Sequence, residues 1–267
     1  MRFRPLLYAQ NLRKGARLTK NLRRTGLLGA LLLCGCSGAP ESEAADGAAG
    51  SANASVCRPP PGISGSPRTI EEAVTLLNAL PKPTTLDCFL ESLDRPLSAY
   101  ATSNIISAQP AFSPASPRIF LRIERLLLSV VPEGAGSHLL EFGYLQPGEE
   151  RSVKAELPLP LTAAVAPSAP YEHVLDKDSS GLLRGGTSCG GCHAAETPDK
   201  SIAFASAFSS LAFRPNPAYR VSLDALNDAQ KACDPVAQPE RCAMLTALFA
   251  HGSVMQAEFP NTMAIFN

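Results

Sequence analysis

The chain has 267 residues, with 24 Lys and Arg against 24 Asp and Glu, 45% hydrophobic residues, eight Cys and no Trp. This length corresponds to one large domain or two ordinary ones, and it can bury a core without relying on disulfides. The net charge of zero argues against a nucleic-acid-binding protein. A mean hydropathy of +0.02 argues against a protein with several membrane spans.

The first 35 residues contain eight Lys and Arg and no Asp or Glu, and they end in an apolar run over residues 26–33. This order is typical of an export signal, and the run is too short for a permanent transmembrane helix. The segment Leu33-Cys34-Gly35-Cys36 then resembles the lipobox of bacterial lipoproteins. The resemblance implies a signal peptide over 1–35 and lipidation of Cys36. With Ser37 next, it also implies an outer-membrane lipoprotein that faces the periplasm. A transit peptide or a buried strand is the alternative interpretation.

Cleavage would change the charge of the protein. From Cys36 onward, 16 Lys and Arg stand against 24 Asp and Glu, a net charge of −8. We therefore expect a partner protein with a basic docking surface, no nucleic-acid partner, and membrane contact through the lipid anchor only. Residues 36–55 are mainly Ala, Gly and Ser, which predicts a flexible stalk.

Residues 56–161 are expected to form a helical entry followed by a β module. The segment Thr69-Ile70-Glu71-Glu72 has the pattern of a capping box, which predicts a helix up to Leu80, before Pro81. A second short helix is predicted over 85–93. Four short β-prone runs separated by Pro- and Gly-containing turns then predict an antiparallel sheet or a small sandwich. These runs cover residues 118–123, 126–131, 139–145 and 151–157.

Residues 158–170 contain four prolines, so residues 162–175 are predicted to be a semi-rigid connection. Residues 176–267 are predicted to form a small all-α module. Its helices are expected over 201–213, 223–233 and 240–250, with Pro239 in a first turn and Gly252 after a helix end. The predicted fold class is therefore α+β.

The segment Cys189-Gly190-Gly191-Cys192-His193 is the strongest chemical signal in the chain. It resembles the haem-attachment site of c-type cytochromes. The resemblance covers little beyond this motif and the helical tail. It implies that Cys189 and Cys192 form thioether bonds to haem c, that His193 binds the iron, and that residues 176–267 form a cytochrome c-like module. A zinc site, a redox-active dithiol and a motif without function are the alternatives.

The resemblance also implies a sixth position on the iron, which a second side chain of this chain could fill. Met255 is the favoured candidate, because it follows Gly252 in a stretch suited to a ligand loop. His251 and Met263 are alternatives, and an open position is another. Met244 lies among Leu and Phe residues and is expected to pack in the core.

Four further cysteines remain, which is an even number. An exported protein lies in an oxidising compartment, where cysteines can pair as disulfides. They are Cys57, Cys88, Cys233 and Cys242. We favour the local pairs Cys57–Cys88 and Cys233–Cys242, with buried free thiols as the alternative.

These observations favour a lipid-anchored monohaem protein that transfers single electrons between partners in the cell envelope. An enzyme is the less favoured class. One alternative is a haem enzyme or gas sensor with an open sixth iron position. Another is a cofactor-free binding lipoprotein in which Cys189 and Cys192 form a disulfide.

Overall fold

The computed structural model describes residues 57–104, 109–176, 186–193 and 195–265, all of which belong to one structural unit. The predicted signal peptide, the lipidation site Cys36 and the predicted stalk lie outside the described residues. Within the described part of the chain, no helix is both long enough and apolar enough to cross a membrane.

Two short helices open the described chain, as the sequence predicts. Helix α1 (Ile70–Ala79) begins at Thr69, whose hydroxyl accepts a hydrogen bond of 3.2 Å from the main-chain N–H of Glu72. Helix α2 (Leu86–Glu91) begins at Thr85, whose hydroxyl caps it in the same way. Capping by a side-chain oxygen satisfies a main-chain N–H group that has no partner within the helix.

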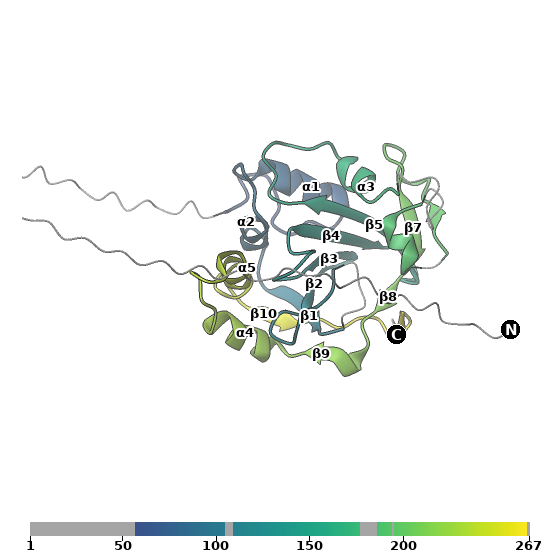
Figure 1. The fold of residues 1–267 in the computed structure, drawn as a ribbon. Coiled ribbons are helices and arrows are strands. Elements are labelled where there is room, and N and C mark those ends of the chain that lie inside the picture. Colours follow the sequence, from purple (N-terminus) through teal and green to yellow (C-terminus); the bar gives the residue numbers. More distant parts are fainter. Residues whose placement is uncertain (1–56, 105–108, 177–185, 194, 266–267) are drawn as a thin grey trace, which may run out of the picture. The chain divides into compact units, whose positions relative to one another are not determined.

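A large, mostly antiparallel sheet forms the centre of the unit (Figure 1). The four predicted strands are confirmed within one or two residues as β2, β3, β4 and β5, and they are consecutive neighbours. The described strands run in the order β10-β1-β2-β3-β4-β5-β7-β6, and β9 also pairs with β1. Their bounds are β1 (Leu97–Thr102), β2 (Arg118–Ile123), β3 (Leu126–Val130), β4 (Leu139–Leu145), β5 (Arg151–Pro158), β6 (Thr197–Pro198), β7 (Phe208–Leu211), β9 (Arg220–Val221) and β10 (Val254–Gln256).

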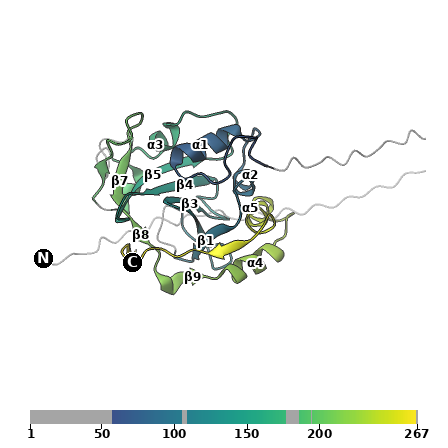
Figure 2. The same cartoon turned by 180° about the vertical axis from the view of Figure 1, so that it is seen from behind.

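The two faces of the sheet differ in character. Ile119 and Leu121 of β2 are buried in the main hydrophobic core, whereas Arg118 and Phe120 of the same strand line a cavity. Strand β4 alternates in the same way, with Leu140 in the core. Helices α1, α2 and α5 (Pro239–Phe249) also contribute residues to that core, and Figure 2 shows them from behind. Alternation places successive side chains on opposite faces of a strand, so the second face is available for a polar site.

The C-terminal third differs most from the sequence prediction. Helices α4 (Leu223–Lys231) and α5 confirm two of the predicted helices, and Pro239 is the first residue of α5. However, β6, β7, β9 and β10 join the same sheet as the predicted β module. The described residues of this region are therefore mixed α and β, and the expected all-α, cytochrome c-like module is not what they form.

The predicted helix over 201–213 is wrong. Its residues contain β7 and the first residue of β8 (Phe213–Arg214). Strand β7 is antiparallel to β5, with Ser152 opposite Ser210. Without β7, β5 would leave an edge of unpaired N–H and C=O groups, and these tertiary hydrogen bonds outweigh a local helical spacing.

The Pro-rich segment over 162–175 packs against α1. It contains the short helix α3 (Ala169–His173), in which Tyr171 is buried and donates a hydrogen bond of 2.6 Å to Glu71. Asn78 of α1 exchanges two hydrogen bonds with the main chain of Val165. The connection is therefore held to the core by specific polar contacts.

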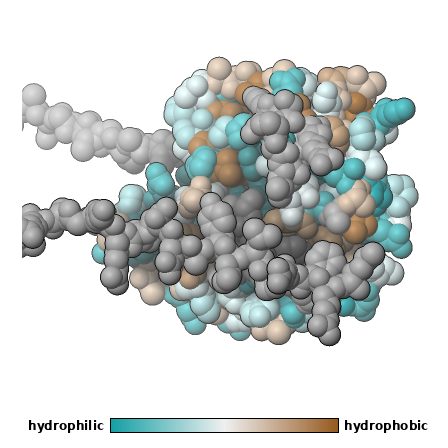
Figure 3. All heavy atoms as spheres, turned by 45° about the vertical axis from the view of Figure 1, so that its right-hand side comes forward, coloured by the Kyte–Doolittle hydropathy of each residue, from teal (hydrophilic) through white to brown (hydrophobic). Residues whose placement is uncertain are grey.

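On the described surface visible in Figure 3, hydrophobic residues lie in small groups among hydrophilic ones. Scattered exposed apolar residues are ordinary for a folded domain. The structural feature that calls for explanation is therefore the cavity on the second face of the sheet.

Candidate functional site

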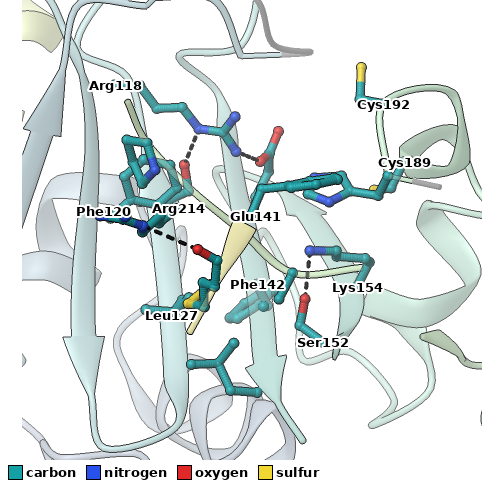
Figure 4. A pocket seen from close by; sticks show the side chains of 18 of the residues that line it. Arg118, Phe120, Leu127, Glu141, Phe142, Ser152, Lys154, Cys189, Cys192 and Arg214 are labelled. Atoms are coloured by element: carbon teal, nitrogen blue, oxygen red, sulfur yellow. Dashed lines mark hydrogen bonds and ion pairs between the residues drawn. The ribbon is translucent and has the colours of Figure 1, made fainter. Parts of the chain in front are cut away.

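A cavity of about 140 Å³ lies against the second face of the sheet (Figure 4). Strands β2 to β5 form its floor, and the segments 188–193, 212–215 and 259–263 contribute residues to its other walls. Much of the lining is apolar. The larger apolar residues in it are Phe120, Leu127, Phe142, Leu145, Phe213, Phe259 and Met263.

The C-x-x-C-H motif forms part of this lining. Residues Ser188–Gly191 form a 3-10 turn, and the main-chain N–H of His193 donates to the carbonyl of Cys189 at 2.8 Å. Because the chain turns so tightly, Cys189, Cys192 and His193 all lie along the same cavity. The structure therefore brings together the three residues that the sequence singled out.

A carboxylate fixes the start of this turn. Glu196 accepts hydrogen bonds from the main-chain N–H of Thr187 at 2.7 Å and from its hydroxyl at 2.5 Å. The Thr187 hydroxyl in turn accepts from the N–H of Cys189 at 3.2 Å. A Cβ on Gly190 would lie only 2.8 Å from the Glu196 carboxylate. A side chain at position 190 would therefore require the Glu196 carboxylate to shift away from the turn.

The imidazole of His193 is oriented by the sheet. Its Nδ1 atom lies 2.8 Å from the main-chain oxygen of Leu211, at the end of β7. A carbonyl can only accept, so Nδ1 carries the proton and Nε2 has its lone pair. Burial lowers the pKa of His193 to about 3, and the charge of Lys154 acts in the same direction. The ring is therefore neutral at physiological pH, which is the form that binds metals.

The two thiols of the motif differ in environment. Cys189 is half-buried, and burial raises its pKa to about 11. Cys192 is exposed. Both are free thiols in this structure, so the disulfide of the cofactor-free alternative is not formed here.

The floor of the cavity carries charged groups that the sequence interpretation did not single out. Arg118 forms an ion pair with Glu141 and donates from Nε to the hydroxyl of Ser129 at 2.6 Å (Figure 4). Lys154 donates to the hydroxyl of Ser152 at 2.6 Å. The alternation of polar and apolar residues along the predicted strands was the available signal, because it places these side chains on one face.

A third basic residue enters from the cover of the cavity. Arg214 in β8 donates from Nε to the main-chain oxygen of Met263 at 3.1 Å. Burial lowers the pKa of Lys154 to about 8, which marks the cost of keeping that ammonium group away from water. The cavity therefore combines apolar walls with basic groups on two sides.

The candidates for the sixth ligand lie in different places. Met255 is half-exposed on β10 and is not part of the cavity wall, and His251 lies near Glu91, 3.8 Å away. Met263 is buried in the cavity wall, next to β11 (Ala264–Ile265), which pairs with β8. Met244 is buried in the main core, as expected. Of these four residues, only Met263 shares the cavity with His193.

The two predicted disulfides are confirmed. Cys57 pairs with Cys88 and Cys233 pairs with Cys242. The first pair ties the start of the described chain to α2, and the second ties the end of α4 to α5. Both lie away from the cavity lining.

In the part of the chain that the structure describes, no group of three or more His, Cys, Asp or Glu side chains is placed to hold a metal ion. Comparison with protein-family models, with curated proteins and with solved structures finds no match to this chain.

Proposed function

We propose that this chain is an exported, lipid-anchored protein that carries one covalently bound haem c and transfers single electrons between partners in the cell envelope. The observation that carries the proposal is the placement of Cys189, Cys192 and His193 along one apolar cavity. Bound haem iron would alternate between the ferric and ferrous states, which moves one electron at a time.

The donor set fits this group. Each thiol would add across one vinyl group of the porphyrin: sulfur bonds to one carbon and the proton passes to the other, so there is no leaving group. The contact of His193 with Leu211 supports the role of an axial ligand, because metal-binding histidines commonly donate their second ring N–H to a main-chain carbonyl.

The cavity is smaller than the pockets that usually hold a ligand. Pockets for drug-sized ligands have volumes of about 300–1,000 Å³, whereas this cavity has about 140 Å³. Porphyrin entry therefore requires the covering segments 188–193 and 259–263 to move away from the sheet. The strands β2 to β5 would stay in place, because each pairs with strands on both sides.

Two further expectations belong to the same proposal. Met263 is the candidate for the sixth ligand, because it lines the cavity together with His193. The net charge of −8 from Cys36 onward favours a redox partner with a basic docking surface, and association should weaken as salt is added.

Denaturing mass spectrometry tests the proposal directly. The full chain is produced in bacteria that mature c-type haem, and we expect a haem adduct that survives unfolding. The variants Cys189→Ser and Cys192→Ser should each lose one thioether, and the double variant should lose the adduct. The matched control Cys233→Ser/Cys242→Ser should keep it. Absence of the adduct from the parent protein would overturn the proposal.

Ferrous spectra then separate electron transfer from the alternative of a haem enzyme or gas sensor. A low-spin ferrous form that ignores carbon monoxide is expected for an electron carrier with a methionine ligand. A high-spin form that binds carbon monoxide would contradict that role.

A further inference from the structure

We propose that the cavity recognises the carboxylates of an apolar ligand through Lys154 and Arg214. For the haem of the proposed function, these groups are the two propionates, so the inference rests on that function for its physiological ligand. The same chemistry would hold a free apolar carboxylate such as a fatty acid, and the experiment below distinguishes the two sources.

The argument begins with the charges around the cavity. Three basic side chains line it, namely Arg118, Lys154 and Arg214, together with the acidic side chain of Glu141. Glu141 is already paired with Arg118. Among the described residues that line the cavity, Lys154 and Arg214 are therefore the two cations without an ion-pair partner.

The contacts of these two cations are with neutral groups. Lys154 donates to the hydroxyl of Ser152, and Arg214 donates to a main-chain oxygen. Among the described residues, neither has a carboxylate within the 4.0 Å of an ion pair. A buried charge without an ion-pair partner is costly, so proteins retain a group such as Lys154 mainly where a ligand or reaction uses it. The half-buried Arg214 faces the same cavity.

The apolar residues that line the cavity indicate that the rest of the ligand is apolar. Phe120, Leu127, Leu145 and Phe259 present apolar surface beside the two cations. Gly143 lies between Leu127 and Lys154 on the floor, and it leaves that part of the floor flat. A ligand with an apolar body and at least one carboxylate matches both features. A small inorganic anion would leave the apolar wall without a contact.

The direction of the two side chains supports separate contacts. Figure 4 shows Lys154 on the β5 side of the cavity floor, near Cys189, and Arg214 on the opposite side, near Arg118. A ligand that carries two carboxylates can therefore engage both cations.

Binding to a chain that cannot attach haem tests this inference. The full chain with Cys189→Ser and Cys192→Ser is titrated with protoporphyrin IX and with its dimethyl ester, which lacks the negative charges. We expect the ester to bind at least about tenfold more weakly, since a charge-assisted contact of about 1.4 kcal/mol corresponds to that factor. In the same background, Lys154→Met/Arg214→Gln should abolish the preference. The control Lys200→Met, at an exposed lysine outside the cavity, should retain it.

Equal affinities for the acid and the ester would overturn the inference. Unchanged binding of the acid by the Lys154→Met/Arg214→Gln variant would overturn it as well. Circular dichroism of each variant verifies that it is folded before its affinity is interpreted.

A second arm uses dodecanoate as the probe and separates this inference from the proposed function. If dodecanoate binds with the same dependence on Lys154 and Arg214 while the parent chain acquires no haem adduct in cells, carboxylate recognition holds and the haem function fails. If the parent acquires haem but shows no dependence on the two cations in either arm, the haem function holds and this inference fails.

Discussion

The Nδ1 atom of His193 lies 2.8 Å from the main-chain oxygen of Leu211, so the sheet itself orients the histidine of the C-x-x-C-H motif. Leu211 ends β7 and is paired with Arg151 of β5. Arg151 also donates to the main-chain oxygen of Ala195 at 2.9 Å, two residues after His193. The C-terminal end of the motif is thus held to β5 and β7, whereas its two thiols lie in the tight turn that precedes it.

The two motif thiols should react at different rates in protein produced without haem. Cys192 is exposed, whereas burial raises the pKa of Cys189 to about 11. Only the thiolate reacts, so at pH 8 we expect iodoacetamide to modify Cys192 at least about ten times faster than Cys189. Peptide mass spectrometry of samples quenched over time measures both rates. In the control Cys192→Ser only the slow reaction should remain, and equal rates in the parent would contradict the burial of Cys189.

Gly143→Val should block the cavity without weakening the fold. A Cβ at this position would lie 3.7 Å from the Cβ of Leu127, an ordinary contact, so the larger side chain fits in the strand and projects over the floor. We expect an unchanged or slightly higher free energy of unfolding, because β-branched residues suit strands better than glycine does. Haem loading measured by absorbance should fall at least about tenfold. Normal loading of the variant would show that the ligand does not occupy this part of the cavity.

Lys154→Met should stabilise the ligand-free protein at pH 7 by about 1–2 kcal/mol, as apolar replacement of a buried charge often does. Burial lowers the pKa of Lys154 from 10.5 to about 8, in a site it shares with Cys189, Arg118, Glu141 and Glu196. Between pH 8 and 10.5 the unfolded parent therefore binds more protons than the folded parent, so its stability rises with pH there. The advantage of the variant should shrink over the same range.

Urea unfolding at pH 7, 9 and 10 measures this trend. The control Lys200→Met removes an exposed lysine and should change the free energy of unfolding by less than about 0.5 kcal/mol at pH 7. A destabilised Lys154→Met protein at pH 7 would mean that this ammonium group stabilises the fold by itself. In that case the cation would need no ligand to explain it.

Tyr171→Phe should lower the free energy of unfolding by about 1–2 kcal/mol, because the Tyr171 hydroxyl donates a 2.6 Å hydrogen bond to Glu71. Burial and this hydrogen bond raise the pKa of Tyr171 well above its usual value of 10. The unfolded chain therefore loses this proton first, so the stability of the parent should fall as pH rises above 10. The variant lacks that contribution. The exposed Tyr219 gives the control Tyr219→Phe, and parallel pH curves for parent and Tyr171→Phe would refute the assignment.

The parts of the fold that could be predicted depend on short-range signals. The capping box at Thr69 and the alternating runs that became β2 to β5 each lie within one element, so the local pattern is sufficient. The two disulfides also join positions only 31 and 9 residues apart. The segment over 201–213 failed because its conformation depends on hydrogen bonds to β5, about 60 residues earlier in the chain.

The sequence likewise predicts only some of the residues of the candidate site. Cys189, Cys192 and His193 lie within five consecutive residues, so their shared chemistry is readable from the sequence. Arg118, Glu141, Lys154 and Arg214 come from four different strands. Each is an ordinary charged residue in its own segment, and only pairing of the strands collects them around one cavity.

The sequence by itself determined the motif, the export-like beginning, the disulfide pairs and the short elements, because each of these is set by residues close together in the chain. Only the tertiary structure decided that the motif faces a sheet and that Met263 lies beside it while Met255 does not. The tertiary structure alone also places Lys154 and Arg214, which have no ion-pair partner among the described residues, around the same cavity. The physical reason is that strand pairing and burial join residues that are far apart in the chain. The side chains can meet only after β7 has paired with the N–H and C=O groups at the edge of β5 and β11 has paired with β8.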